Sequence, residues 1–153
     1  KVCLSILNTW SGGAKWSSSR TLSDVILGIQ QHIFTESPYG NEPGFGNKPT
    51  DEHVVYNAVV RLGSMIEGML QMITNPPPAF KDLVIYHFYG PKQPVILKQL
   101  DLWKHELELI PNETWVKGSN YYISNQTHFR SNKDDMLAWY ADIIDQIKDL
   151  LRL

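Results

Sequence analysis

Cys3 is the single cysteine of the chain, and its thiol is the strongest nucleophile that the sequence offers. A thiolate can attack an acyl group, whereas a buried thiol behaves as a small hydrophobic group. Taken alone, Cys3 fits the second description because it lies in the apolar run Val2–Leu7. A lone cysteine forms no internal disulfide and no cysteine-rich zinc site. This favours a reducing compartment, the cytoplasm or the nucleus.

The histidines do not add a second catalytic pattern. They form no multi-ligand metal pattern, so neither a metal nor another cofactor is expected. A Cys–His pair of the protease type remains open, but the spacing does not single out one histidine. The five histidines are His32, His53, His87, His105 and His128.

Several short blocks follow Cys3 in a fixed order. They are Val2-Cys3-Leu4-Ser5-Ile6-Leu7, Thr9-Trp10, Trp16-Ser17, an amphipathic segment, and Pro38-Tyr39-Gly40-Asn41-Glu42-Pro43. In this order and at these separations the blocks resemble ubiquitin-conjugating enzymes, most of all the Z-type and giant members with a Pro-Tyr-x-Asn-Glu-Pro-Gly loop. The resemblance is fullest over residues 1–46, looser to about residue 75, and slight beyond.

The resemblance implies a role for Cys3 as an acyl carrier. Cys3 would receive the C-terminal carboxyl group of ubiquitin, or of a ubiquitin-like modifier, from an activating enzyme. It would then pass this group to a lysine or to a ubiquitin ligase. These three proteins are the expected partners. The runner-up hypothesis is a catalytically inactive adaptor that binds ubiquitin or a ligase, and a third possibility is an unrelated helical scaffold.

Glu42 corresponds to the acidic residue of the family that gates the entering lysine. The commoner residue there is aspartate, so the extra methylene of Glu42 moves its carboxylate. Asn41 is the second candidate of this loop, and Tyr39 is expected to hold the loop in place. Apart from the resemblance, Glu42 could be an ordinary solvated carboxylate.

The segment after Thr21 predicts an amphipathic helix capped by Thr21, with Asp24 at the third helical position. Its predicted buried stripe consists of Leu22, Val25, Ile26, Ile29 and Ile33. At about 100° per residue, Leu27 and Gln31 lie roughly 140° and 180° from this stripe. In the resembled family this outer face contacts the donor ubiquitin, which implies that Leu27 and Gln31 make this contact.

The loop Trp16, Ser17, Ser18 and Ser19 corresponds to the Trp-Ser-Pro-Ala loop that binds RING-type ligases in the family. Ser18 replaces the proline, which removes the fixed φ angle and leaves the loop less preorganised. Trp10 and Trp16 are expected to be packing anchors rather than ligase contacts.

Helical elements must position these residues. The periodicity predicts helices over about 51–73, 79–89, 94–109 and 134–151, with a mostly polar loop over 111–132 and a short strand at Tyr121-Tyr122-Ile123. The inner stripe of the helix over 51–73 is Val55, Val59, Leu62, Ile66, Met69, Leu70 and Ile73. The last helix carries an aromatic and aliphatic stripe, for which a core role is favoured over a partner-binding face. Its members are Met136, Tyr140, Ile143, Ile144, Ile147 and Leu151.

The expected fold class is α+β. The resemblance implies the ubiquitin-conjugating fold, of which residues 1–75 are the C-terminal part of the catalytic core and 76–153 a helical extension packed on it. The family's four-stranded sheet and His-Pro-Asn motif are not visible in the chain. A segment is therefore expected to precede Lys1, where the chain begins without Met in an apolar run.

Bulk properties exclude other function classes. The net charge is −2 and 20% of residues are charged, without a basic run, so neither nucleic acid nor an anionic membrane is an expected partner. No apolar stretch approaches the roughly 18–20 residues of a membrane span. Two glycosylation acceptor patterns, at Asn112 and Asn125, are expected to be chance occurrences.

Overall fold

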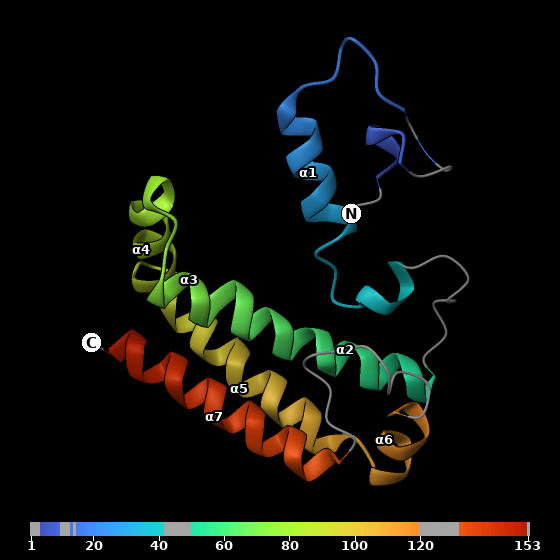
Figure 1. Ribbon diagram of the computed structural model, residues 1–153, viewed down its shortest axis with the longest axis vertical. Coiled ribbons are helices and arrows are strands. Elements are labelled where there is room, and N and C mark those ends of the chain that lie inside the picture. The colour runs from blue at the N-terminus through green and yellow to red at the C-terminus, as the bar shows by residue number, and fades with distance from the viewer. Residues whose placement is uncertain (1–3, 10–12, 14, 42–49, 120–131, 153) are drawn as a thin grey trace. The chain divides into compact units, whose positions relative to one another are not determined.

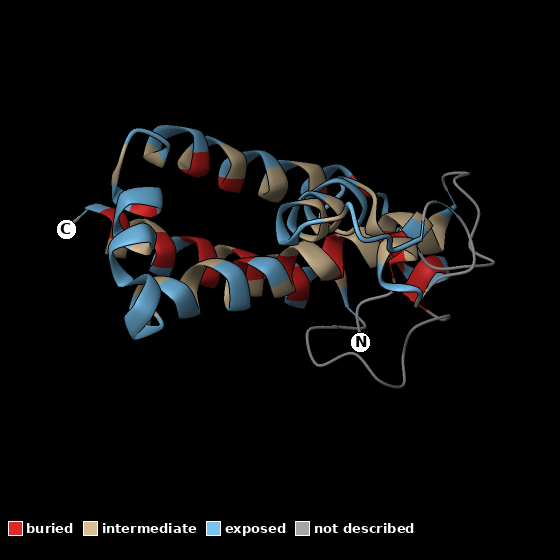
Figure 2. Cartoon of the chain, turned by 90° about the horizontal axis from the view of Figure 1, so that it is seen from above, coloured by how far each residue is buried: buried red, intermediate tan, exposed pale blue. Residues whose placement is uncertain are grey.

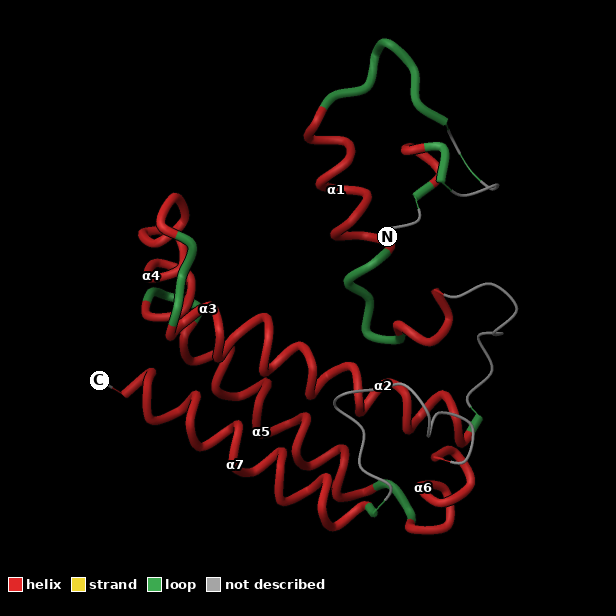
Figure 3. Tube along the Cα trace, viewed as in Figure 1, coloured by secondary structure: helices red, strands yellow, loops and turns green. Residues whose placement is uncertain are grey.

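The computed structural model describes residues 4–9, 13, 15–41, 50–119 and 132–152 of the chain. These residues form helices, turns and loops, and no strand occurs among them (Figure 3). The chain divides into two compact units, Lys1–Asn47 and Lys48–Leu153. The first unit contains the predicted catalytic residues, and the second contains most of the hydrophobic core.

The first unit is built around α1 (Leu22–His32), with the 3₁₀ turns η1 (Ser5–Leu7) and η2 (Pro38–Asn41) before and after it. The predicted cap of α1 is confirmed. Thr21 Oγ1 accepts a hydrogen bond from the backbone N–H of Asp24, and the Asp24 carboxylate accepts one from the Thr21 N–H at 2.7 Å. This reciprocal capping box explains why α1 begins at Leu22.

The predicted buried stripe of α1 is wrong for the part of the unit that the structure describes. No residue of α1 is buried, and Leu22 and Ile26 are 72% and 56% exposed. An apolar helix face is buried only where a second layer packs on it. Of the described residues in this unit, η1 lies beside α1 and brings Ile6 close to Gly28, and this short turn does not cover the whole face.

The second unit is a bundle of long helices. A continuous helical rod, made of α2 (Asp51–Gly63), the π-helical segment η3 (Ser64–Leu70) and α3 (Gln71–Thr74), packs with α5 (Gln93–Leu109) and α7 (Lys133–Arg152), as Figure 1 shows. The turn η4 (Pro78–Phe80) and α4 (Lys81–Tyr89) connect α3 to α5. The short helix α6 (Asn112–Ser119) packs on α2. The predicted helices over 79–89, 94–109 and 134–151 are confirmed.

The core of this unit lies between α2, η3, α5, α6 and α7, with Phe88 added from α4, and Figure 2 colours the buried residues red along the helices. Trp115 and Tyr140 are its largest fully buried side chains. The stripe of α7 belongs to the core, as favoured from the sequence, because all six of its predicted members are buried. They are Met136, Tyr140, Ile143, Ile144, Ile147 and Leu151.

The helix predicted over 51–73 is confirmed, but its inner face changes course at η3. Val55, Val59 and Leu62 are buried as expected, whereas Met65, which the sequence pattern left out, is fully buried. A π-helical turn closes i→i+5 hydrogen bonds and so contains more residues than an α-helical turn. The buried face therefore moves along the sequence, and Ile66, Met69, Leu70 and Ile73 are only partly buried.

The polar loop predicted over 111–132 is wrong for residues 112–119, which form α6. Trp115 draws this segment into the core, where the side chain is 1% exposed. The backbone N–H of Trp115 donates to the carbonyl of Pro111 at 3.0 Å, which fixes the first turn of α6. The strand predicted at Tyr121-Tyr122-Ile123 lies outside the described residues. The predicted boundary near residue 75 separates the part that resembles the family's catalytic core from the helical extension. It is a different kind of boundary from that between the two compact units, and it stays a prediction.

Candidate functional site

Cys3 and Glu42, the two predicted catalytic residues with the clearest chemistry, lie outside the described residues. The structure does describe the segments next to them in the sequence. These segments are Leu4–Thr9, the loop 15–20, α1 and η2. They show which backbone and side-chain contacts hold the flanks of the candidate site, while the roles of Cys3 and Glu42 stay predictions.

Thr9 holds the residue that directly follows Cys3. The Leu4 N–H donates to Thr9 Oγ1 at 2.9 Å, and the Thr9 N–H donates to the Leu4 carbonyl at 3.2 Å. Thr9 Oγ1 also lies 3.2 Å from this carbonyl. Leu4 itself is 5% exposed. The backbone after Cys3 is thus closed into a tight turn. Sequence analysis missed this role of Thr9, although it named Thr9-Trp10 among the blocks that follow Cys3.

Asn8 completes this turn with a left-handed backbone conformation, φ 56°. Its N–H donates to the Ser5 carbonyl at 2.9 Å, which ends η1. Asparagine tolerates this conformation better than most residues with a Cβ atom. An Asn at this position is a readable sequence signal for a turn.

The loop of Trp16, Ser17, Ser18 and Ser19 is exposed throughout. Two contacts restrict the backbone of this loop in place of the missing proline. Ser17 Oγ and Ser19 Oγ are hydrogen-bonded at 2.8 Å, and the Arg20 N–H donates to the Ser17 carbonyl at 3.0 Å. Trp16 is 47% exposed, more than a packing anchor would be. An exposed aromatic beside a closed turn can contact a partner, and the ligase role of this loop stays a prediction.

Leu27 and Gln31 lie one turn apart on α1, and both are exposed. Leu27 keeps 49% of its surface exposed. Residues four apart are neighbours on a helix surface, so the two side chains belong to one patch. The carboxylate of Asp24, one turn earlier on α1, is held by other residues. The backbone N–H and the hydroxyl of Thr21 donate hydrogen bonds to it and lower the pKa of Asp24. Arg20, 3.7 Å away, lowers this pKa further. The donor-ubiquitin role of Leu27 and Gln31 stays a prediction.

Asn41 ties η2 to the end of α1. Its Nδ2 donates to the carbonyl of Ile33, the C-cap residue of α1, at 3.1 Å and to Thr35 Oγ1 at 3.3 Å. The Ile33 carbonyl can only accept, and this contact therefore sets the orientation of the Asn41 amide. These hydrogen bonds hold the residue that directly precedes Glu42. They do not test the predicted part of Asn41 in catalysis, which stays a prediction.

Among the described residues, no group of three or more His, Cys, Asp or Glu side chains could hold a metal ion. Nor does any described helix have the length and apolar character needed to cross a membrane.

Curated relatives of the chain are ubiquitin-conjugating enzymes by name. A dual E2 ubiquitin-conjugating enzyme/E3 ubiquitin-protein ligase, BIRC6 of Mus musculus, is 30% identical over 161 residues, which cover 100% of this chain and 3% of that protein. Ubiquitin-conjugating enzyme E2 Z of Xenopus tropicalis is 42% identical over 79 residues, covering 46% of this chain and 25% of that protein. E2 Z of Danio rerio is 44% identical over 75 residues, covering 48% of this chain and 22% of that protein.

The chain thus spans a small part of the length of these relatives, and no protein-family model matches it. The alignment to BIRC6 covers this whole chain, and the alignments to E2 Z are shorter but higher in identity. Both indicate the same family. The order of blocks after Cys3 indicates the same family. The chain is therefore a member of the ubiquitin-conjugating enzyme family by sequence.

Proposed function

We propose that the chain is part of an active ubiquitin-conjugating enzyme, with Cys3 as the carrier of ubiquitin or a ubiquitin-like modifier. The alignment of the entire chain to a named E2 enzyme is the observation that carries this proposal. The proposed partners are the modifier, its activating enzyme and a ubiquitin ligase. The proposed locations are the cytoplasm and the nucleus, where a reduced thiol is maintained.

Charging is a transthiolation. The Cys3 thiolate attacks the thioester carbonyl between the activating enzyme and the C-terminal glycine of the modifier. A new C–S bond forms at Cys3, the old C–S bond breaks, and the thiolate of the activating enzyme leaves. No net oxidation occurs, and the thioester energy is retained for the next step.

Discharge transfers the acyl group to an amine. A neutral lysine amine attacks the Cys3 thioester, the C–S bond breaks, and the Cys3 thiolate leaves as the amine loses its proton. Free lysine has a pKa of about 10.4, so at pH 7 only roughly four amines in ten thousand are neutral. Glu42 is proposed to orient the entering lysine and take up its proton.

The described contacts support this arrangement at the edges of the site. Thr9 fixes the backbone after Cys3, and Asn41 fixes the backbone before Glu42. The exposed pair Leu27 and Gln31 leaves a patch on α1 for the donor modifier. We further propose the α+β ubiquitin-conjugating fold for the protein, with a sheet covering the apolar face of α1.

The decisive experiment is a charging assay of the full-length protein with activating enzyme, ATP and ubiquitin. We expect an adduct on a non-reducing gel that disappears with thiol. Cys3→Ala should abolish it, and Cys3→Ser should give an oxyester that resists thiol. An adduct that persists in Cys3→Ala contradicts the proposal.

Absence of charging with ubiquitin and with every ubiquitin-like modifier tested with its own activating enzyme would also contradict it. If the protein did not charge but still bound ubiquitin or a ligase, the adaptor hypothesis would replace the enzyme hypothesis.

A further inference from the structure

Thr9 contacts both polar backbone groups of Leu4, the residue that directly follows Cys3. The Leu4 N–H donates to Thr9 Oγ1 at 2.9 Å, and the Thr9 hydroxyl donates to the Leu4 carbonyl at 3.2 Å. The Thr9 N–H donates to the same carbonyl, also at 3.2 Å. A hydroxyl can accept and donate at once, which is why a threonine side chain serves both groups.

The Leu4 N–H belongs to the peptide group that links Leu4 to Cys3. A peptide group is planar, so a hydrogen bond that fixes the direction of its N–H fixes the plane of the whole group. Leu4 is 5% exposed, and a buried N–H that loses its partner costs free energy, so the backbone would turn to find another acceptor. The Thr9 hydroxyl therefore controls the orientation of the link between Cys3 and η1.

The turn η1 itself has other supports. Asn8, at φ 56°, donates its N–H to the Ser5 carbonyl at 2.9 Å. Gly13 lies against Ser5, because an added Cβ would be 2.8 Å from Ser5 Oγ, and its φ of 84° favours glycine. These contacts do not involve the Thr9 hydroxyl. Loss of the hydroxyl alone should therefore act on the peptide group before η1 and leave the turn in place.

We propose that Thr9 is a positioning residue for the thiol of Cys3. This inference rests on the proposed function, because the position of the thiol matters only if Cys3 accepts an acyl group. In charging, the Cys3 sulfur forms a C–S bond with the thioester carbonyl carbon as the old C–S bond breaks. A misplacement of about 1 Å can cost roughly a hundredfold in the rate of such a step.

Thr9 takes no part in the transfer of the acyl group or of a proton. It acts through the backbone of Leu4, so its removal should lower the rate of the chemical step. Binding of the activating enzyme should change little. A residue that only stabilised the fold would not separate these two quantities.

The test compares Thr9→Val with Thr9→Ser in the full-length protein. Valine keeps the branched shape of threonine without the hydroxyl, whereas serine keeps the hydroxyl. Single-turnover charging is measured over a range of concentrations of activating enzyme loaded with ubiquitin. We expect Thr9→Val to lower the maximal charging rate at least about tenfold and to change the half-saturating concentration less than about twofold. Thr9→Ser should recover most of the rate.

Asn8 provides a second route if Thr9→Val does not fold. Asn8→Val puts a β-branched residue at φ 56°, which should shift the turn that carries the Thr9 hydroxyl. Asn8→Gly removes the same amide but suits this backbone conformation. We expect Asn8→Val to charge at least about threefold more slowly than Asn8→Gly, because only the valine displaces the backbone.

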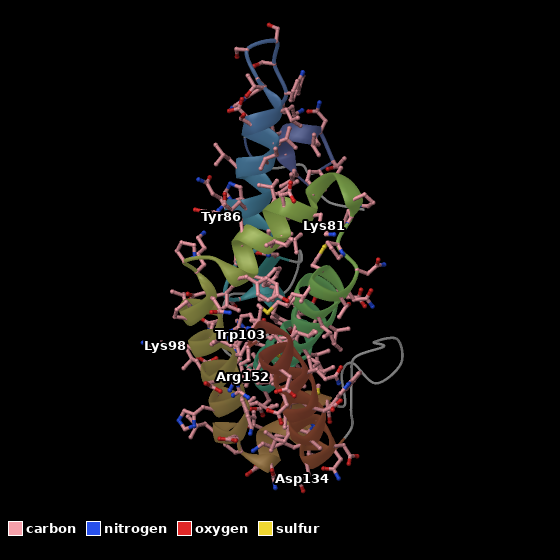
Figure 4. The ribbon with its side chains drawn as sticks, turned by 90° about the vertical axis from the view of Figure 1, so that its left-hand side faces the viewer. Lys81, Tyr86, Lys98, Trp103, Asp134 and Arg152 are labelled. Carbon is pink, nitrogen blue, oxygen red and sulfur yellow. The ribbon has the colours of Figure 1, made fainter. Side chains whose placement is uncertain are left out.

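Two hydroxyl deletions in the second unit are the matched controls. Thr74→Val removes a hydroxyl that donates to the Leu70 carbonyl at 2.8 Å. Tyr86→Phe removes the hydroxyl of an exposed side chain on α4 (Figure 4). Neither control should change the charging rate, and circular dichroism of each variant checks the fold.

Four results overturn the positioning role while the unaltered protein still charges. These are an unaltered rate in Thr9→Val, equal slowing by Thr9→Val and Thr9→Ser, and a loss confined to the half-saturating concentration. The fourth, for a Thr9→Val variant that unfolds, is equal charging by Asn8→Val and Asn8→Gly.

Failure of the proposed function gives a different result. In that case the unaltered protein does not charge with ubiquitin or with any ubiquitin-like modifier, and the role of Thr9 is rejected together with the enzyme hypothesis.

Discussion

At the scale of single residues, Tyr140 is the group whose proton affinity the fold changes most clearly. Its side chain is fully buried, and its hydroxyl donates to the carbonyl of Ala58. Burial raises the pKa of Tyr140 above its ordinary value, and the nearby Glu106 adds to the rise while Arg61 opposes it. The ion pair of Arg61 with Glu106 spans α2 and α5 near this tyrosine.

The raised pKa of Tyr140 predicts a loss of stability in alkali. The unfolded chain releases this proton at about pH 10, whereas the folded chain keeps it. The free energy of unfolding is therefore unaffected by Tyr140 below about pH 10 and falls above it, by up to about 1.4 kcal/mol per pH unit. Urea unfolding between pH 8 and pH 11 measures this slope.

Tyr140→Phe is the control for this prediction. It should lower the free energy of unfolding at neutral pH by about 1 kcal/mol, because the hydrogen bond to Ala58 is lost. It should also reduce the alkaline slope. The same slope in both proteins would mean that Tyr140 does not titrate in this way.

Glu42 provides a test of mechanism at the same scale. Glu42→Ala should slow discharge onto free lysine by roughly tenfold or more and leave charging of Cys3 nearly unchanged, because only discharge needs the incoming amine to lose a proton. Single-turnover assays of both steps measure this separation. Equal effects on charging and discharge would reject the gating role, and Glu42→Asp is expected to restore part of the rate.

At the scale of elements, the contact of α6 with α2 depends on a glycine. A Cβ atom on Gly118 would lie 2.3 Å from the carbonyl oxygen of Asp51 and 2.7 Å from a methyl group of Val55. The backbone at the start of α2 can yield little, because Thr50 caps it through the His53 N–H. Gly118 therefore allows α6 to approach α2 closely enough for Trp115 to reach the core.

Gly118→Ala should lower the free energy of unfolding by about 1–3 kcal/mol, because the added methyl group has no space. Urea unfolding followed by tryptophan fluorescence measures the loss. Gly68→Ala is the matched control, since no atom lies within 4 Å of its added Cβ. It should be neutral or stabilise the chain by up to about 1 kcal/mol. The account of α6 fails if both substitutions have the same effect.

At the scale of the whole molecule, burial differs between the two units. The second unit buries a continuous core across α2, η3, α5, α6 and α7, whereas α1 in the first unit has no buried residue. Amides in a well-buried core exchange with solvent only through global unfolding, and those of poorly packed helices exchange through local opening. The two units should therefore differ in stability.

Native-state hydrogen exchange measures this difference. We expect amides of α1 in the 153-residue chain to exchange at least roughly tenfold faster than those in the middle of α7. Thr21→Ala should accelerate exchange in α1 several-fold more, because it removes the capping box, and leave α7 unchanged. Equal protection of α1 and α7 would show that α1 is packed more tightly than its exposure indicates.

The sequence alone determined the family and most helices of the second unit. Ordered blocks after Cys3 led to the family. The apolar periodicity of 51–74, 93–109 and 133–152 is a local signal, and so are the cap of the first of these helices and the terminal charges of the last. Only the tertiary structure decided two other features. Met65 is buried because a π-helical turn shifts the inner face of the helix. Residues 112–119 form a helix because the burial of Trp115 outweighs their weak local signal.

Exposure of the α1 and α4 surfaces also lay beyond the sequence. Apolar spacing shows which side of a helix can be buried, but not whether another element covers it. Leu22 and Ile26 were expected inside and are exposed, and in the part of the chain that the structure describes Leu83 and Tyr86 of the apolar helix α4 are 63% and 69% exposed. Burial is a relation between elements, and for this reason only the tertiary structure could determine it.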